Sequence, residues 1–550
     1  MLRLILNASG AKSLGKSKVS KFLEIGFQGS RNTMRKYHSD SNYNLRLISE
    51  NKSKYSRILY YFAAAAINVS ELVKHNTKDN LWVAVNGKVY DLTEFAQKHP
   101  GGSAAILEFA GRDASNAFNQ IHRKDLIPFV LAEEKFLGHL VGKLPEEEVE
   151  LSEEEILRLK NIRNKPPLHK IFSITDMEYV AKHVLPKSTY NYFATGSEDE
   201  FTLREGHYAY SRVYFRPRIL CDVREVDLST TMLGTKVAIP IYFSATGGQG
   251  RAHPEAEKII TRVAKKHGMV QMIPFLSKWP VEEIVAEADP NQDQWFQLHF
   301  NSLETFKKAP EIIKKINSLP NIKALMLNVD CPCSPIREKD IRTRAEATGA
   351  DVEQLASISD PNNVYATLTW EDIANFRKMT DLPIVLKGVQ RTEDVLKAAE
   401  LGYNGVILSN TGGRALDFSQ PTLEVLAETM PELRKQPYYN KDKFQVYIDG
   451  GIRRSTDVVK ALCLGATGVG IGRPFLYSMS SYGEDGVNKL IEILKVGLSK
   501  DMKLLGAKNV DELDESFLNL KDLYNRGKAQ DKLYDALYDS LPFPKFEEDT

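Results

Sequence analysis

Short apolar runs rich in β-branched residues alternate with longer amphipathic stretches between residues 241 and 472. Each run has the length of a buried strand, and each stretch that follows has the period of a helix with one apolar face. The eight runs are 241–245, 269–273, 295–300, 324–329, 384–387, 405–409, 446–449 and 468–472. Eight strands with helices between them predict a fold of the α/β class, a (β/α)8 TIM barrel that we place at residues 168–519.

A different pattern precedes the barrel. Two short alternating strands, WVAVNG and KVYDL, are followed by AAILEFAGRDASNAF, which has helical periodicity and a turn at Gly111. This pattern predicts a small α+β domain over residues 69–143. His99, in the tetrapeptide HPGG, and His122 lie 23 residues apart at the ends of two such helices. We expect the two imidazoles to face each other across a flat ring.

Three further segments complete the chain. Residues 144–167 are acidic and then mixed, which is typical of a charged linker, and residues 520–550 form a C-terminal tail. Residues 1–57 carry twelve Lys or Arg against three acidic residues, and the apolar run at 58–69 is too short to span a bilayer. Residues 1–68 therefore have the profile of a mitochondrial presequence with a sorting segment, which implies the intermembrane space. The alternative is a disordered basic tail on a cytosolic protein.

Composition narrows the classes of partner. The 73 basic and 72 acidic side chains of the 550-residue chain nearly cancel, so no overall field favours nucleic acid or a membrane surface. We expect neither a nucleic-acid partner nor a permanent membrane anchor. Four cysteines without a C-x-x-C pair predict reduced thiols.

Polar residues follow the predicted barrel strands, at the end where barrel enzymes place their chemistry. Glycine-rich turns with an arginine follow the seventh and eighth strands, as phosphate binding there requires. The residues at seven of the eight strand ends include Ser244, Ala245, Thr246 and Gly247; Gln297 and His299; Asn328 and Asp330; Lys387; Ser409, Thr411 and Arg414; Asp449, Gly450, Gly451, Ile452 and Arg453; and Gly472 and Arg473. A phosphorylated cofactor is implied.

The blocks LKGVQRTEDV, SNTGGRALDF, DGGIRRSTDVVKALCLGA and GIGRPF resemble the FMN-dependent L-2-hydroxy-acid oxidoreductases over residues 170–510. The HPGG domain resembles the cytochrome b5 family, in which His99 and His122 would be the axial ligands of haem b. Six-coordinate haem has no open position for dioxygen, so it would pass single electrons. The resemblance implies FMN and haem b as cofactors, cytochrome c as electron acceptor and a homotetramer.

The resemblance also implies roles for single residues. Lys387 would stabilise negative charge on the reduced flavin, Gln297 would bind its pyrimidine portion, and Asp449, Arg453, Gly472 and Arg473 would hold the phosphate. Arg414, Arg337 and Tyr192 would bind the substrate carboxylate, and Asp330 would orient the base. The remaining cofactor-binding positions would be Ser244, Ala245, Thr246, Gly247, Pro274, Asn328, Gly450, Gly451 and Ile452.

The catalytic base of that family is missing. Its histidine corresponds to Thr411, and no histidine follows His299 in the chain. A threonine hydroxyl is far too weak a base near neutral pH. The family also has tyrosine, serine and threonine where His299, Pro274 and Asn328 stand. One hypothesis makes His299 the replacement base. Two interpretations stay open. The first is a dehydrogenase of L-lactate or a related 2-hydroxy acid, which would pass electrons from FMN through haem to cytochrome c. The second is a catalytically impaired descendant that binds ligands or relays electrons.

Overall fold

The computed structural model describes residues 65–99, 104–122, 126–142, 152–300, 303–333, 335–348 and 368–526. Nearly all of the predicted presequence, and the tail beyond Arg526, lie outside these residues. In the part of the chain that is described, no helix is both long and apolar enough to cross a membrane.

The predicted α+β domain is confirmed. Its sheet has the strand order β1-β5-β4-β3-β2, with β1 (Ala65–Asn68), β2 (Asn76–Thr77), β3 (Asn80–Val85), β4 (Lys88–Asp91) and β5 (Phe136–Val141). Asn86 and Gly87 join β3 to β4 with φ of 52° and 75°, the conformation that a two-residue hairpin turn requires. The helices of this domain are short, with α4 (Val69–Leu72) between β1 and β2, and with α5 (Thr93–Lys98), α6 (Ala104–Leu107), α7 (Ser115–Ile121) and α8 (Ile127–Val130) between β4 and β5.

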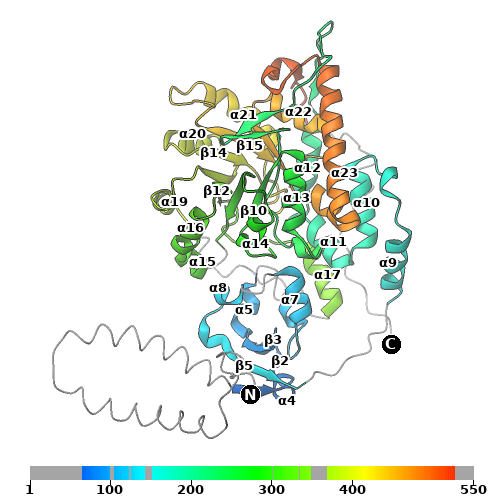
Figure 1. The fold of residues 1–550 in the computed structure, drawn as a ribbon, viewed down its shortest axis with the longest axis vertical. Coiled ribbons are helices and arrows are strands. Elements are labelled where there is room, and N and C mark those ends of the chain that lie inside the picture. The colour runs from blue at the N-terminus through cyan, green and yellow to red at the C-terminus, as the bar shows by residue number, and fades with distance from the viewer. Residues whose placement is uncertain are drawn as a thin grey trace, which may run out of the picture. The chain divides into compact units, whose positions relative to one another are not determined.

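The predicted TIM barrel is also confirmed, with eight parallel strands that close in the order β10-β11-β12-β13-β14-β15-β16-β9. The strands are β9 (Ile241–Phe243), β10 (Val270–Pro274), β11 (Gln294–Leu298), β12 (Ile322–Asn328), β13 (Ile384–Val389), β14 (Gly405–Leu408), β15 (Gln445–Asp449) and β16 (Gly468–Ile471). Figure 1 shows these strands in green to orange, surrounded by helices.

The helices that cover the barrel keep the strand–helix alternation. They are α13 (Glu257–His267), α14 (Val281–Ala286), α15 (Leu303–Lys307), α16 (Ala309–Asn317), α17 (Glu338–Thr348), α19 (Trp370–Arg377), α20 (Thr392–Glu400), α21 (Thr422–Arg434), α22 (Ser455–Cys463) and α23 (Arg473–Leu505). Ahead of the first strand lie α10 (Ile174–Val184), α11 (Lys187–Ala194) and α12 (Phe201–Ser211).

Aromatic side chains fill the amino-terminal end of the barrel. The rings of Tyr242, Trp295 and Tyr447 have centroids 5.2 to 5.8 Å apart. The hairpin of β7 (Thr230–Met232) and β8 (Thr235–Val237) packs against this cluster. A Cβ at Gly468, where β16 begins, would come 2.5 Å from the Met232 sulfur, so the hairpin closes this end. Any site inside the barrel is therefore confined to the carboxyl ends of the strands.

The structure differs from the linker prediction in its second half. Glu153–Asn164 form helix α9, with Ser152 as N-cap, and this helix packs against α10. Arg158 donates to the carbonyl of Val184 at 3.0 Å. The high charge of this segment is therefore the solvated face of a docked helix.

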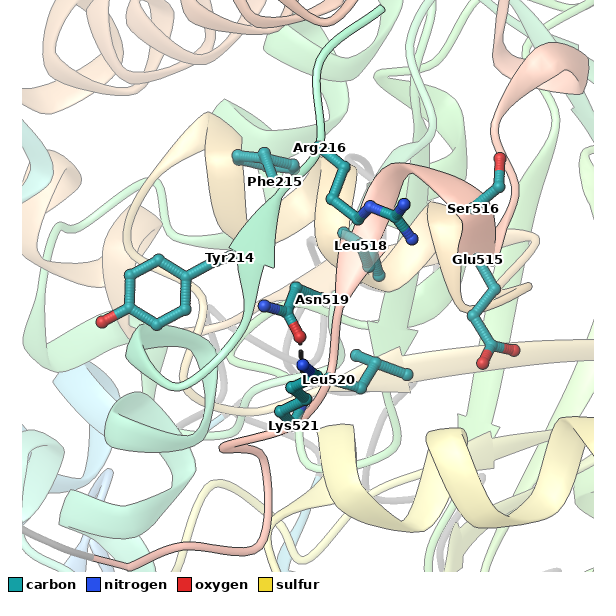
Figure 2. A pocket seen from close by; sticks show the side chains of 9 residues that line it. All are labelled: Tyr214, Phe215, Arg216, Glu515, Ser516, Leu518, Asn519, Leu520 and Lys521. Carbon is teal, nitrogen blue, oxygen red and sulfur yellow. Dashed lines mark hydrogen bonds between the residues drawn. The ribbon is translucent and has the colours of Figure 1, made fainter.

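A second surface feature lies near the described end of the chain. Strands β6 (Tyr214–Phe215) and β17 (Leu518–Asn519) pair antiparallel. A cleft of about 640 Å³ lies beside this pair. Figure 2 shows the side chains of Arg216 and Glu515 among those that line it. Its walls contain none of the residues predicted for the site.

Candidate active site

His99 and His122 lie together, as the sequence predicted. His99 is the C-cap of α5 and His122 the C-cap of α7. Their ring centroids are 6.0 Å apart with the ring planes at 76°. Because a metal–imidazole bond is about 2 Å long, an iron bound by both rings would separate their centroids by roughly 6 Å. Burial, with a contribution from His99, lowers the pKa of His122 to about 3, so its ring is the neutral form that binds metal. The pair fits a haem iron.

At the carboxyl ends of the barrel strands, Lys387 on β13 is central. Its Nζ donates to the Ser409 Oγ at 3.2 Å and the Thr411 Oγ1 at 3.4 Å, and it lies 3.8 Å from the Asp449 Oδ2. Burial raises the pKa of the Asp449 carboxyl. The structure therefore places a buried ammonium in the middle of the strand ends, where the resemblance expects the flavin edge.

Thr411 occupies the position of the family's base and links two charged residues. Its hydroxyl donates a short hydrogen bond to the Asp330 Oδ2 and accepts one from Lys387. Its φ is 50°, a conformation that is a clear outlier for a β-branched residue. With its proton engaged by a carboxylate, the hydroxyl holds Asp330 in place and cannot take up a proton from a substrate.

The predicted carboxylate-binding residues also converge. The guanidinium carbons of Arg414 and Arg337 lie 5.3 and 5.7 Å from the ring centroid of Tyr192. Arg414 donates to the carbonyls of Tyr192 and Thr195 at 2.7 and 3.0 Å. Burial, and then the charges of Arg337 and Arg473, lower the pKa of Arg414 to about 9. An anion placed here would relieve that repulsion.

His299 follows β11 and shares this environment. Burial lowers the pKa of the His299 imidazole to about 4. The negative charge of Asp330 acts to raise this pKa, and the positive charge of Lys387 acts to lower it. The imidazole is therefore neutral near pH 7 and lies within electrostatic reach of the residues around Thr411.

Among the residues predicted at the phosphate, two glycines adopt positive φ angles, and the two arginines contact protein groups. Gly450 and Gly451 have φ of 94° and 76°, and a Cβ at Gly451 would come within 1.8 Å of the Gly206 carbonyl oxygen. Arg453 lies 3.4 Å from Glu178. Arg473 donates to the carbonyls of Phe193, Gly412 and Thr195 and so braces the Thr411 loop against α11. Its contact with a phosphate stays a prediction.

The remaining strand-end residues fit a flavin. Among the described residues, the buried polar atoms without a hydrogen-bond partner at the strand ends include the Ser244 Oγ, the Gln297 Oε1 and the Asp449 Oδ1. Pro274 lies opposite Gln297 in the sheet register, and Asn328 lies opposite Lys387. Thr246 donates to the Ser244 carbonyl, while Ala245, Gly247, Ile452 and Gly472 belong to the same strand-end loops. A flavin ring, with donors and acceptors along one edge, supplies the partners that buried polar groups require.

One residue of the site was expected at a strand end without a role, and one was missed from the sequence. Ser409, at the end of the sixth apolar run, accepts from Lys387 and from the Thr411 backbone N–H at 3.0 Å. Arg251, in the 3-10 helix η3 (Gln249–Arg251), lies 4.7 Å from the Tyr192 ring centroid. Arg251 carried no signal in the sequence, because its contact with Tyr192 joins two distant segments.

Comparison with known proteins decides the family. The model of the FMN-dependent dehydrogenase family matches residues 181–520, and that of the cytochrome b5-like haem/steroid binding domain matches residues 68–146. The chain belongs to the FMN-dependent dehydrogenase family. An L-lactate dehydrogenase (cytochrome) from Wickerhamomyces anomalus is 44% identical over 86% of this chain and 83% of its own, and that from Saccharomyces cerevisiae is 44% identical over 88% and 85%.

Solved structures agree with this assignment. A flavocytochrome b2 variant with pyruvate bound is 44% identical, with a TM-score of 0.63 over 73% of this chain and all of its own. A mandelate oxidase with (S)-2-phenylpropionate is 32% identical, with a TM-score of 0.55 over 64% of this chain and 98% of its own. This family member is thus an oxidoreductase whose cofactors are FMN and haem b.

Proposed function

We propose that the protein oxidises L-lactate or a related 2-hydroxy acid to the 2-oxo acid and passes the electrons from FMN through haem b to cytochrome c. The observation that carries this proposal is the convergence of Lys387, Arg414 and Tyr192 at the strand ends. The relatives named L-lactate dehydrogenase (cytochrome) support the substrate class and the acceptor.

The oxidation removes two electrons and two protons: the C2–H and O–H bonds break and the C2=O double bond forms. FMN, when bound, accepts the two electrons. Arg414, Arg337 and Tyr192 hold the carboxylate, because guanidinium groups suit a planar anion. Lys387 compensates negative charge near the reduced ring. His99 and His122 would hold the haem iron, and a haem held by two histidines would supply one-electron transfer.

His299 is the proton acceptor in this proposal. It is neutral at pH 7, whereas the Thr411 hydroxyl is committed to Asp330. A pKa of about 4 makes His299 a weaker base than an ordinary imidazole, so turnover is slow. We expect His299→Ala to lower the rate of flavin reduction about 10²-fold or more, without loss of bound FMN. An unchanged rate in that variant would remove His299 from the mechanism.

One observation favours a second function. Thr411 bridges Lys387 and Asp330 where a base would stand. In this alternative the protein binds a 2-hydroxy or 2-oxo acid, or relays single electrons, without oxidising substrate.

The test is steady-state reduction of cytochrome c by a panel of 2-hydroxy acids, with the 2-oxo acid product measured in the same reaction. The proposal predicts one molecule of product for every two molecules of cytochrome c reduced. If the 2-oxo acid forms no faster with the protein than without it, for every substrate tested, the result would support the binding or relay function. His122→Ala is the matched control, because it should abolish cytochrome c reduction and leave flavin reduction intact.

We further propose location in the mitochondrial intermembrane space, from the basic and apolar segments of residues 1–68, and assembly as a homotetramer, from the family resemblance. Fractionation of mitochondria with protease protection tests the location. Light scattering on the purified protein tests the assembly, and a monomeric mass would contradict it.

A further inference from the structure

Helix α12 lies directly against residues 449–453, where the sequence predicts the FMN phosphate. We call these residues the glycine loop. A Cβ at Gly451 would come within 1.8 Å of the Gly206 carbonyl oxygen, so the helix and the glycine loop meet backbone to backbone. The Tyr210 hydroxyl donates to the Gly450 carbonyl at 3.4 Å, and burial raises the pKa of this hydroxyl. The position of α12 therefore affects the position of the glycine loop.

Arg212 fixes the carboxyl end of α12. It is the C-cap of the helix, and its side chain is 5% exposed. Its guanidinium donates to Glu205, to Glu424 on α21 and to the Leu523 carbonyl, each at 2.9 Å. The planar guanidinium can bind several acceptors in fixed directions at once. Arg212 thus joins α12 to α21 and to the C-terminal part of the chain.

Residues 518–526, the last that the structure describes, hold this arrangement from the surface. We call them the C-terminal strap. Figure 2 shows residues 518–521 beside the cleft described above. At the other end of the strap, Arg526 donates to the second carboxylate oxygen of Glu424 at 2.9 Å, and its side chain is 46% exposed. Arg526 therefore adds a second positive charge to that of Arg212 beside a carboxylate that is fully buried.

We propose that Arg212 and the C-terminal strap position the glycine loop through α12, so that release of the strap weakens the binding of the FMN phosphate. Arg212 and Arg526 are positioning residues in this proposal, because both act through α12. A buried carboxylate is costly to leave uncompensated, so loss of the Arg526 charge destabilises the arrangement that fixes the end of α12. The inference concerns the binding of FMN and does not depend on the oxidation of a substrate.

The phosphate is the part of FMN that should respond. A loop binds phosphate through backbone N–H groups that point at one spot, so a small shift of the loop weakens this contact directly. Riboflavin has the same ring system and lacks the phosphate. A loss of affinity confined to FMN therefore separates positioning of the glycine loop from general destabilisation of the barrel.

The test measures the dissociation constants of FMN and riboflavin by titration calorimetry on the full-length, haem-loaded protein freed of flavin. A charge-assisted hydrogen bond contributes about 10- to 100-fold in affinity, so the wild type should bind FMN at least about 10-fold more tightly than riboflavin. Because the Arg526 pair is half-exposed, Arg526→Gln should weaken FMN about 3- to 10-fold and leave riboflavin within about twofold. Arg526→Lys keeps the charge and should recover most of the loss.

Arg218→Gln is the matched control. Arg218 is 48% exposed and pairs with Glu512 at 3.2 Å, so this variant loses a similar ion pair in a neighbouring part of the chain that does not involve Glu424. It should change neither affinity. The inference would be overturned by an unchanged FMN affinity in Arg526→Gln, by an equal loss for FMN and riboflavin, or by an equal loss in both variants.

A second readout needs no variant. Coupling between two sites acts in both directions, so bound FMN should in turn hold the C-terminal strap. Hydrogen exchange at the amides of residues 518–526 should become slower with FMN and stay unchanged with riboflavin. Equal slowing by both flavins, or equal wild-type affinities for them, would overturn the inference, while the product assay above still decides the proposed function.

Discussion

Replacing Thr411 by histidine returns an imidazole to the position between Lys387 and Asp330. Asp330 already accepts a hydrogen bond from the residue at position 411, so its carboxylate can accept one from the new ring and stabilise its protonated form. A positioned general base contributes about 10²- to 10⁴-fold in rate. In the proposed mechanism His299, a weak base, already supplies about 10²-fold of this. We therefore expect Thr411→His to speed flavin reduction by up to about 10²-fold, which corresponds to about 3 kcal/mol of activation free energy.

The backbone favours this change. Residue 411 has a φ of 50°, which β-branched side chains adopt only with strain, whereas histidine and asparagine are enriched in this region. Left-handed strain at a non-glycine residue costs on the order of 1 kcal/mol. Thr411→His should consequently unfold at the same temperature as the wild type or at a higher one, so a loss of rate could not be attributed to poorer folding.

The assay is anaerobic stopped flow, with L-lactate mixed against the protein loaded with FMN and haem. Thr411→Asn is the matched control, because asparagine relieves the same backbone strain and can contact Asp330 but is not a base. Equal rates in the two variants would refute the reasoning, because backbone relief would then explain the change. A wild-type rate as fast as that of Thr411→His would also refute it.

Two predictions concern other parts of the chain. His122→Ala removes an axial ligand, so the purified protein should lose its haem absorbance and keep its flavin absorbance; retained haem with an unshifted spectrum would contradict the assignment of the pair. Glu257, buried at the start of α13, accepts from the Lys278 N–H, and burial raises its pKa to about 7. The unfolded chain loses this proton near pH 4.5 and the folded chain near pH 7, so the free energy of unfolding should fall as pH rises across that window, by up to about 3 kcal/mol. The glutamine side chain of Glu257→Gln cannot ionise, so this variant should not show the decline. The free energy of unfolding is measured by urea unfolding at pH 5 and at pH 7.5. If it falls equally in the variant and the wild type, Glu257 is not the group responsible.

The barrel could be predicted because a parallel strand buried on both faces must be apolar along its length. Seven of the eight strands begin within one residue of the apolar runs, and β12 begins two residues earlier, at Ile322. Lys387, Asp449 and Thr411 could be predicted for the site because the first two end such runs and Thr411 lies two residues beyond the run that ends at 409. Strand ends are close in space whatever lies between them in sequence.

Other features depend on tertiary contacts that the sequence pattern does not carry. Helix α9 was expected as part of a linker, because its acidic first turn is also typical of a solvated hinge. Arg473 was expected at a phosphate, which stays a prediction, but the sequence did not show that its guanidinium donates to three carbonyls of distant segments. The hydrogen bond between Thr411 and Asp330 joins residues 81 positions apart. Such pairs become visible only when the strands have closed into the barrel.

The measurement that tests the central claim most directly is anaerobic mixing of the wild-type protein, loaded with FMN and haem, with an excess of a 2-hydroxy acid. The absorbances of flavin and haem are followed from milliseconds to minutes. Our account predicts that the flavin bleaches first and the haem is reduced after it, with slow but complete conversion and formation of the 2-oxo acid. If both cofactors stay oxidised with every 2-hydroxy acid while Thr411→His is reduced, the wild-type protein is not a dehydrogenase and the account is wrong.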